Sequence, residues 1–282
     1  YRMFLSIDFE DFNHDLKRGL GICKSGKIKS DLLWEKYNEI NEFYKKSDNE
    51  VGKYGTFFCT AIIAEKEPSL IRKIAKDGHE IACHSYYHDL LINQQLSDIE
   101  RYLSKAKDLL QEVSGKEVLG FRAPSFAINK INPSQYNIIQ KIFKYDSSYF
   151  CSNKQQLDSF RKQMKLKELK LFPIYSKRIL GKPFRLGGSY LKIFPKKYAE
   201  WMINEAKKNG FNPHIYLHPY EFGISKGFAI KRQEMNKIGF SRSLYWSLKQ
   251  NQWLSFKNRN LKTKIHSLIC KNKLDGILSN LL

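Results

Sequence analysis

The sequence contains few cysteines, and none stand in a pattern that would cross-link the chain or bind metal through thiolates. Its 282 residues include five cysteines, which are Cys23, Cys59, Cys83, Cys151 and Cys270. They are odd in number and scattered, and no pair has CxxC spacing, which argues against a disulfide framework and a thiolate zinc site. Because this pattern favours a reducing compartment, we expect a cytoplasmic protein.

Long apolar runs are also missing. The longest, such as residues 56–64, are far shorter than the roughly 20 residues that a bilayer-spanning helix needs. The apolar stretch 3–7 is too short for the core of a signal peptide, and acidic residues follow it at once. Since the chain opens with Tyr1-Arg2-Met3, either Met3 is the true start or a leader has been removed, and both interpretations stay open.

Acidic residues are scarce relative to basic ones. The chain has 28 Asp and Glu against 49 Lys and Arg, which gives a formal net charge of +21. This charge suits a phosphate-bearing partner such as a lipid-linked glycan, an anionic membrane surface or nucleic acid, although lysine-rich solvated faces explain it more simply. No aromatic-basic RNA-binding signature or zinc-finger spacing accompanies the charge, so we expect no nucleic-acid partner. Association with a membrane surface stays open.

The chain does have a regular alternation of two kinds of segment. With 42% hydrophobic residues it can bury a substantial core, in one large domain or two small ones. Runs rich in β-branched and aromatic residues predict strands at 2–8, 56–63, 79–83, 118–122, 169–172 and 214–218. Apolar residues at helical spacing predict helices at 31–46, 67–77, 97–114 and 195–209, with a capping box at Ser97 and a further helix after Asn132-Pro133. This order predicts an α/β fold with parallel strands, either a barrel or an open doubly wound sheet.

Polar side chains close four of the predicted strands. Asp8, His84, Arg122 and His218 each stand where an apolar strand ends. In both architectures the carboxyl ends of the strands meet at one edge and form the active site. The coincidence of four such residues is therefore a functional signal.

His84 and His88 form the sharpest local motif. Residues at i and i+4 share one face of a helical turn, so both imidazoles can reach one divalent cation. Such a pair on its own more often consists of ordinary core or surface histidines, but here it directly follows the strand at 79–83. His79, which precedes that strand, is interpreted as structural.

The acidic cluster Asp8-Phe9-Glu10-Asp11 offers the oxygen ligand and the base that a two-histidine hydrolytic metal site needs. Asp8 and Glu10 project to the same side if the strand continues, so one can bind metal while the other takes a proton from the bound water. Glu10 and Asp11 both stay open as the third ligand, and strand alternation favours Glu10. The plainer interpretation is a polar loop whose acids cap a helix.

Three further residues complete the constellation. Arg122 is either part of a structural ion pair or the group that holds a carboxylate base ionised. His218 ends an apolar strand and suits the role of a general acid, and a buried aspartate nearby, Asp146, would keep it protonated near neutral pH.

In this order the motifs resemble those of the polysaccharide deacetylase (NodB-homology) family, especially the branch found in exopolysaccharide and surface-glycan gene clusters. The resemblance covers essentially residues 5–221. It rests on Ser6-Ile7-Asp8, Thr56-Phe57-Phe58, Gly78-His79-Glu80-Ile81, His84 with His88, Arg122-Ala123-Pro124, Asp146-Ser147-Ser148, Gly187-Gly188-Ser189-Tyr190 and Leu217-His218-Pro219. It implies a distorted (β/α) barrel of about seven parallel strands in a single domain, 1–282, with a helical C-terminal extension at 222–282.

The resemblance further implies metal-dependent hydrolysis of the acetamide of an N-acetylated sugar, in a surface or extracellular glycan or its precursor, with release of acetate. It implies Asp8 as the base, a carboxylate (Glu10 or Asp11) with His84 and His88 as metal ligands, Arg122 as the orienter of Asp8, and His218 as the acid paired with Asp146. Ser125, Phe126, Tyr190 and Leu217 would line the sugar groove, with the Ser125 or Phe126 N–H facing the oxyanion. The family's adjacent aspartates are absent, because Phe9 follows Asp8. Two imidazoles and a carboxylate suit zinc, although cobalt, nickel, manganese and iron also fit.

Two other functions fit the same residues. One is an amidase that acts on a small amide, and the other is a glycan-binding protein that has lost catalysis. Residues 240–282 predict helices whose apolar side chains stand among many lysines. Packing of these helices against the barrel is the favoured interpretation, and a basic amphipathic surface that meets anionic lipid is the alternative.

Overall fold

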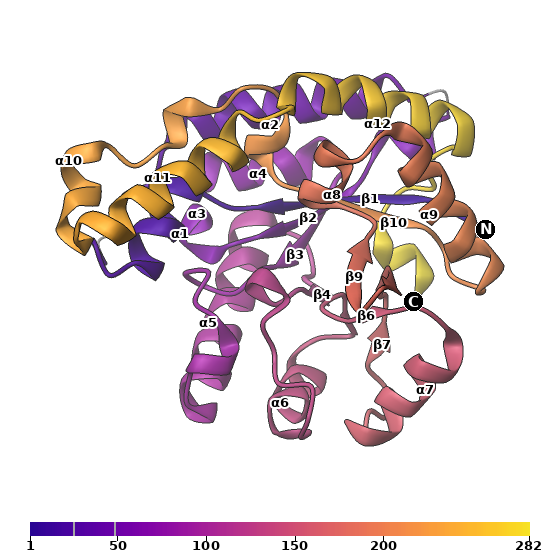
Figure 1. The fold of residues 1–282 in the computed structure, drawn as a ribbon. Helices are drawn as coiled ribbons and strands as arrows, with labels where there is room; N and C mark the ends of the chain where they lie inside the picture. The colour runs from indigo at the N-terminus through magenta and orange to yellow at the C-terminus, as the bar shows by residue number, and fades with distance from the viewer. Residues whose placement is uncertain (25, 48) are drawn as a thin grey trace.

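At the centre of the computed structural model, which describes residues 1–24, 26–47 and 49–282, is a curled sheet of seven parallel strands (Figure 1). Its spatial order is β10-β1-β2-β3-β4-β5-β7. The strands are β1 (Phe4–Phe9), β2 (Thr56–Cys59), β3 (Glu80–Cys83), β4 (Gly120–Phe121), β5 (Tyr145–Asp146), β7 (Lys170–Leu171) and β10 (His214–Leu217). The predicted α/β fold, a distorted barrel of about seven parallel strands, is thereby confirmed.

Helices surround this sheet. They are α1 (Phe12–Gly19), α2 (Ser30–Lys45), α3 (Ala61–Lys66), α4 (Pro68–Lys76), α5 (Leu96–Ser114), α6 (Ser134–Ile142), α7 (Lys154–Gln163) and α9 (Lys196–Lys208). Short 3₁₀ turns are η1 (Val51–Lys53), η2 (Leu91–Asn93), η3 (Pro124–Phe126), η4 (Pro219–Glu221), η5 (Lys226–Phe228) and η6 (Asn236–Ile238). The predicted helices are confirmed to within about two residues at each end, because each carries one continuous apolar stripe that packs on the sheet.

The alternation of residues along β1 determines which side chains enter the barrel. Leu5 and Ile7 belong to the apolar layer between the sheet and the helices. Phe4 instead packs in a separate cluster inside the curve of the sheet. Because successive strand residues point to opposite faces, Ser6 and Asp8 share the inner face with Phe4. A polar column therefore runs up the inside of the barrel toward the carboxyl ends of the strands.

A second, smaller sheet stands beside the open edge of the barrel. It contains β6 (Phe150–Cys151), β8 (Ile174–Ile179) and β9 (Lys182–Arg185), in the order β6-β8-β9, and α8 (Gly188–Ile193) follows it. Gly187 forms an isolated parallel bridge with Tyr216 of β10. In the described part of the chain β10 is an edge strand of the main sheet and pairs there with β1 alone. The bridge therefore connects the small sheet to this edge of the main sheet.

The last segment of the chain finishes at the amino-terminal ends of the barrel strands. After β10 come α10 (Arg232–Met235), α11 (Phe240–Leu254), α12 (Asn258–Asn272) and the short turn η7 (Leu278–Leu281). Leu278 joins the inner cluster that contains Phe4 and Tyr145. The final turn therefore covers the amino-terminal ends of the strands, whereas α10 and α11 lie beside α1 at the other end (Figure 1). None of the described helices is both long and apolar enough to cross a membrane.

Two predictions about the ends of elements are wrong. The strand predicted at 56–63 stops at Cys59, and Ala61–Lys66 forms α3 instead, because a short apolar run is buried equally well as strand or helix. The capping box predicted at Ser97 does not form, since α5 begins at Leu96 and its N-cap, Gln95, makes no side-chain capping bond. Gly115 does end this helix in the left-handed conformation, with φ of 66°.

Candidate active site

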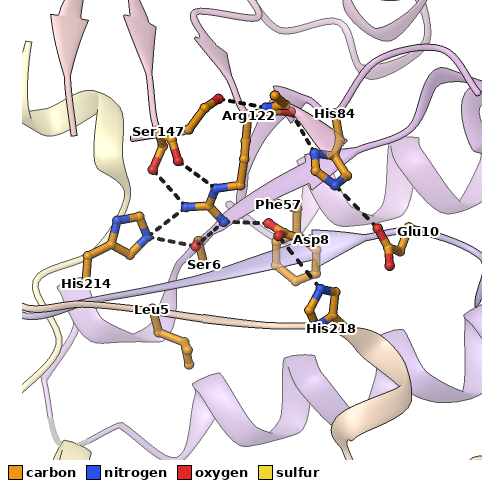
Figure 2. Close-up of polar contacts among 12 residues, drawn as sticks. Leu5, Ser6, Asp8, Glu10, Phe57, His84, Arg122, Ser147, His214 and His218 are labelled. Carbon is orange, nitrogen blue, oxygen red and sulfur yellow. Dashed lines mark hydrogen bonds and ion pairs between the residues drawn. The ribbon is translucent and has the colours of Figure 1, made fainter. Parts of the chain in front are cut away.

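A pocket of about 660 Å³ lies at the carboxyl ends of the parallel strands. Its polar lining includes Asp8 and Glu10 from the end of β1, His84 and His88 from the segment after β3, and His218 from the end of β10. The structure therefore brings together five of the candidate residues that the sequence indicates. In Figure 2 four of them, all but His88, converge from the ends of β1, β3 and β10 around one space.

Glu10, His84 and His88 form the tightest part of this group. Each offers one ligand atom, and the three atoms lie within 4.8 Å of one another. Glu10 Oε2 is 3.4 Å from His84 Nε2 and 2.7 Å from His88 Nε2. The predicted helical turn is wrong, because residues 84–90 form a loop in which Ser85 and His88 have φ of 66° and 64°. The two imidazoles converge through left-handed backbone, an uncommon conformation that tends to occur at functional sites.

The chemistry of these three side chains fits a divalent cation. His84 Nδ1 lies 2.7 Å from the Arg122 carbonyl oxygen, to which it donates, so its Nε2 carries a lone pair toward Glu10. Glu10 Oε2 is buried and receives no hydrogen bond of acceptable geometry from the described residues. Two electron-rich atoms facing each other away from water are unfavourable unless a cation lies between them.

Glu10 and His88 shift each other's pKa. Burial alone would raise the pKa of Glu10, but the charge of His88 and the close approach of both histidine rings hold that pKa well below its usual value. Burial lowers the pKa of His88, yet Glu10 and Asp15 outweigh this effect and raise it to about 9. A proton on His88 and a metal ion therefore compete for the same place, so metal binding should weaken in acid.

Asp11, the alternative third ligand, has a different task. It is the N-cap of α1, where Oδ1 accepts a hydrogen bond from the His14 N–H at 3.0 Å and Oδ2 accepts one from the Lys29 N–H. Both carboxylate oxygens are thus occupied by backbone donors, so the structure does not support Asp11 as a ligand. Phe9, the residue that separates Asp8 from Glu10, turns outward and packs edge-on against Tyr37 and Phe57.

Asp8 is held by Arg122, the pairing that the family resemblance implies. Arg122 Nη1 donates to Asp8 Oδ1 at 2.5 Å, and the whole arginine side chain is buried. Its other donors contact Ser6 Oγ, Ser147 Oγ, the Ser147 carbonyl and His214 Nε2, at 2.9 to 3.2 Å (Figure 2). Because burial and the Arg122 charge hold the pKa of His214 well below its usual value, His214 is neutral and accepts from the guanidinium. All five N–H groups of the arginine are therefore satisfied, which fixes its orientation toward Asp8.

His218 faces Asp8 across the pocket, with Nε2 at 4.0 Å from Asp8 Oδ2. Its other nitrogen, Nδ1, lies 2.9 Å from Glu221 Oε2, and the His218 N–H donates to the same oxygen at 3.0 Å. Burial lowers the pKa of His218, but Glu221, with help from Glu10 and Asp8, raises it to about 9. His218 is therefore protonated at neutral pH and presents an N–H to the pocket.

The predicted pairing of His218 with Asp146 is wrong. Asp146 Oδ1 lies 2.5 Å from Ser148 Oγ, and Oδ2 accepts from the Ser148 N–H and the Tyr136 hydroxyl at 3.0 and 3.2 Å. Ser148 Oγ in turn accepts from the Ala123 N–H at 2.8 Å. Asp146 thus anchors the backbone just before Ser125, and Glu221 takes the place that the sequence analysis gave to Asp146. Burial raises the pKa of Asp146 to about 6.

Ser125 and Phe126 line the pocket, as the resemblance implies. Both have left-handed backbone, with φ of 51° and 57°. The Phe126 N–H donates to the Ala123 carbonyl at 2.9 Å, and the Ala127 N–H donates to Pro124 at 2.9 Å. Among the described residues, the Ser125 N–H has no acceptor. Of the two donors considered for an oxyanion, only that of Ser125 is available.

Tyr190 and Leu217 do not reach the pocket, and their assignment to the sugar groove is wrong. The Tyr190 hydroxyl donates to the Pro183 carbonyl at 2.8 Å, and its ring stacks on Phe194. A Cβ on Gly187 would stand 2.2 Å from the Tyr216 ring, so the paired glycines before Tyr190 serve close packing. Leu217 is fully buried on the outer face of β10, because the strand alternation that aims His218 inward turns its neighbour outward.

The remaining walls were not predicted from the sequence. Phe12, Asp15 and Leu16 come from α1, and Trp246 and Trp253 come from α11. Asp15 Oδ1 lies 2.6 Å from His14 Nδ1, whereas its buried Oδ2 has no hydrogen-bond partner among the described residues. Burial raises the pKa of Asp15 to about 6. The spacing of Phe12, Leu16 and Gly19 after an N-capping aspartate is a helix signal that could have located this wall.

Comparisons with known proteins identify a similar family and several relatives. Residues 49–150 match the family model described as polysaccharide deacetylase, and residues 144–250 match a domain of unknown function, DUF3473. A peptidoglycan deacetylase of Helicobacter pylori is 26% identical over 139 residues, which cover 49% of this chain and 42% of that protein. A peptidoglycan-N-acetylglucosamine deacetylase of Bacillus cereus is 30% identical over 69 residues, which cover 24% of this chain and 25% of that protein. The chain thus matches less than half the length of either relative.

Solved structures show the same fold at low sequence identity. A Mycobacterium smegmatis protein named as a polysaccharide deacetylase superposes with a TM-score of 0.55 and 16% identity, over 98% of this chain and 93% of that one. A CE4 family pseudoenzyme from Bacillus anthracis superposes with a TM-score of 0.51 and 14% identity, over 99% of this chain and 64% of that one. At such identities the likeness concerns the fold.

Proposed function

The chain belongs to the polysaccharide deacetylase family, and from that membership we propose that it is a metal-dependent N-deacetylase of an N-acetylated glycan. The proposed reaction hydrolyses the acetamide on a sugar of a cell-surface or extracellular glycan, or its precursor, and releases acetate. The observation that carries the proposal is the convergence of Glu10, His84 and His88 beside Asp8 and His218 in one pocket. The names of the two peptidoglycan deacetylases support a glycan as the substrate class.

Glu10, His84 and His88 would hold the metal. Two imidazoles and one carboxylate form a donor set that catalytic zinc uses, and it leaves open positions for water and substrate. When bound, the ion would polarise the acetamide carbonyl and make a bound water more acidic. Other divalent first-row metals accept the same ligands, so zinc is the favoured ion within that group.

Asp8 and His218 would move the protons. Asp8 is oriented by its ion pair with Arg122, so its free oxygen can take a proton from the attacking water. A C–O bond then forms at the acetamide carbon, and the Ser125 N–H can donate to the oxygen that gains charge. His218 carries its proton on Nε2, opposite Asp8, and gives it to the sugar nitrogen as the C–N bond breaks. The products are acetate and a free amino sugar.

The apolar walls suit a sugar ring. Phe12 contacts Tyr220 and Trp253 edge-on, with ring centroids 5.0 and 5.7 Å apart, and all three residues line the pocket. Aromatic faces pack against the C–H faces of a sugar, while the polar floor receives its acetamido group.

Metal analysis combined with acetate detection tests this proposal. The purified protein should contain about one zinc or related ion per chain and should release acetate from at least one glycan that contains N-acetylhexosamine. His84→Ala should lose most of the metal, whereas the exposed His266→Ala should keep it. Full metal occupancy in the His84 variant would refute the proposed ligand set.

Asp8→Asn separates catalysis from metal binding. The variant should keep the metal, because Asp8 is outside the ligand group, and its turnover should fall about 10²–10⁴-fold, since general-base assistance is lost. Wild-type acetate release by this variant would contradict the role of Asp8. A wild-type protein that binds metal and glycan but releases no acetate would instead be a glycan-binding homologue, and ammonia or ring-opened products would indicate an amidase.

A further inference from the structure

An exposed apolar ridge runs along α11. Phe240, Leu244 and Leu248 are 82%, 54% and 64% exposed, and they stand four residues apart, so they line one side of the helix. Tyr245 beside them is 51% exposed, and Phe256 just after the helix is 50% exposed. A single exposed leucine is ordinary on a protein surface, but consecutive turns of exposed large apolar side chains mark an interaction site.

The other side of α11 is firmly attached to the protein. Leu254 is buried in the main core, and Gln250 exchanges hydrogen bonds of 2.9 and 3.2 Å with the backbone of Ile230. Trp246 and Trp253 line the catalytic pocket. The helix therefore has three functionally different faces, and the ridge is exposed because the opposite side is already occupied.

The surroundings of the ridge are strongly basic. Residues 226–259 contain eight Lys and Arg and one acidic residue, Glu234. Glu234 Oε1 is 2.6 Å from Lys17 Nζ, so its charge is already paired. In the part of the chain that the structure describes, Lys237 and Arg242 take part in no ion pair, and both are exposed. The ridge thus stands in a segment rich in basic side chains, whose one acidic residue is already paired.

We propose that this ridge docks the protein on an anionic lipid bilayer. An amphipathic helix with large apolar side chains on one face and cations around them lies in the membrane interface, where the apolar groups enter the acyl boundary and the cations meet lipid headgroups. A second copy of this chain is a poor occupant, because it would bring another net charge of +21 against the first.

Docking through α11 would also position the catalytic pocket. Since Trp246 and Trp253 on the same helix form a wall of that pocket, its opening would lie beside the bilayer surface. A glycan attached to the membrane, rather than one free in solution, would then be presented to the site. The docking itself requires no catalytic activity, so it is separable from the proposed function.

Vesicle flotation tests this proposal. The full chain is mixed with vesicles of phosphatidylcholine alone or with added phosphatidylglycerol, and we expect binding to the anionic vesicles that weakens as salt is added. Leu244→Ser/Leu248→Ser should reduce that binding about tenfold or more, and further addition of Phe240→Ser should reduce it again. A matched control is Ile131→Ser/Leu180→Ser, which removes two apolar side chains that are 82% and 98% exposed elsewhere, and it should bind as the wild type does.

Three outcomes would overturn the proposal. The first is no flotation of the wild type with anionic vesicles, and the second is equal flotation of the ridge variants. The third is a wild-type dimer that the ridge variants convert to a monomer, which would assign the ridge to a second copy. Acetate release from a soluble oligosaccharide should be unchanged in the ridge variants, because none of the three residues lines the pocket. Failure of the deacetylase proposal would leave the flotation result intact, so the two are distinguishable.

Discussion

Glu221 sets the proton affinity of the residue that faces Asp8. Its carboxylate accepts from His218 Nδ1 at 2.9 Å and is buried, and Lys192 Nζ lies 3.8 Å from its other oxygen. Glu221→Gln keeps the shape but removes the charge that raises the pKa of His218 to about 9. The imidazole should then lose its proton at lower pH, and the alkaline limb of kcat/KM should move down by roughly 1 pH unit or more.

The titration of His218 can also be followed without catalysis. The imidazole C–H resonance, assigned with His218→Ala, should titrate at lower pH in Glu221→Gln than in the wild type. The half-buried Glu234 supplies the control: Glu234→Gln should change neither the resonance nor the activity profile, because Glu234 pairs with Lys17 and does not line the pocket. An alkaline limb that stays in place in Glu221→Gln would show that another group donates the proton.

For individual residues, the sequence predicts which residue types come together in the site. It does not predict which of several carboxylates pairs with a given histidine. Strand alternation correctly brings Glu10 rather than Asp11 to the histidines, since that rule is local. The partner of His218 depends on tertiary packing, and the nearer candidate in space is Glu221 rather than Asp146. A readable signal exists, because His218 and Glu221 stand at the N-cap and N3 positions of a turn with Pro219 at N1.

Strand β4 contains only two residues, and one of them is a glycine that its neighbour requires. Gly120 lies beside Tyr145 of β5, and a Cβ there would stand 2.0 Å from the tyrosine ring. Tyr145 is fully buried, and its hydroxyl donates to Glu80 at 2.9 Å. Gly120→Ala should therefore destabilise the protein by about 1–3 kcal/mol or more, because the ring has no free space to enter.

Thermal or urea unfolding measures this effect, with Gly19→Ala as the control. A Cβ at Gly19 meets nothing within 4 Å, and its φ lies outside the left-handed region, so its unfolding free energy should stay within about 1 kcal/mol of the wild type or rise slightly. Equal stability of the two variants would mean that the sheet tolerates a wider spacing between β4 and β5 than the register implies.

The elements that the sequence predicts are those with a clear period. Long amphipathic helices such as 96–114 show a full stripe, whereas β4, β5 and β7 have two residues each and no measurable alternation. His84 and His88 have helical spacing but lie in a loop. The prediction that the two imidazoles converge is therefore right, and the prediction of a helical turn is wrong. The sequence analysis does not predict α1, because the acidic residues just before it also fit a polar loop.

Over the whole molecule, the catalytic motifs lie at the carboxyl ends of the barrel strands, whereas the C-terminal turn η7 covers their amino-terminal ends. The parallel α/β architecture could be predicted because strand and helix patterns alternate along the chain. The contribution of residues 274–282 could not, because contacts such as Leu274 with Met3 join positions more than 270 residues apart in sequence. Nor does any sequence pattern show that α11 supplies a pocket wall. The cytoplasmic location expected from the cysteines stays a prediction.

Leu278 tests how strongly this distant closure stabilises the fold. It is 1% exposed in the cluster with Phe4 and Tyr145, its N–H donates to Thr56 Oγ1 at 2.9 Å, and the next N–H donates to buried Glu80 at 3.2 Å. Leu278→Ala should lower the free energy of unfolding by about 2–5 kcal/mol, whereas Leu282→Ala, at a position 48% exposed, should change it by about 0.5 kcal/mol or less. Metal content should be equal in both variants and the wild type at temperatures where all are folded, because the ligands lie at the other end of the strands. A loss of metal in Leu278→Ala before any unfolding would show that the two ends are coupled through the polar column inside the barrel, with Arg122 as the side chain best placed to transmit the change.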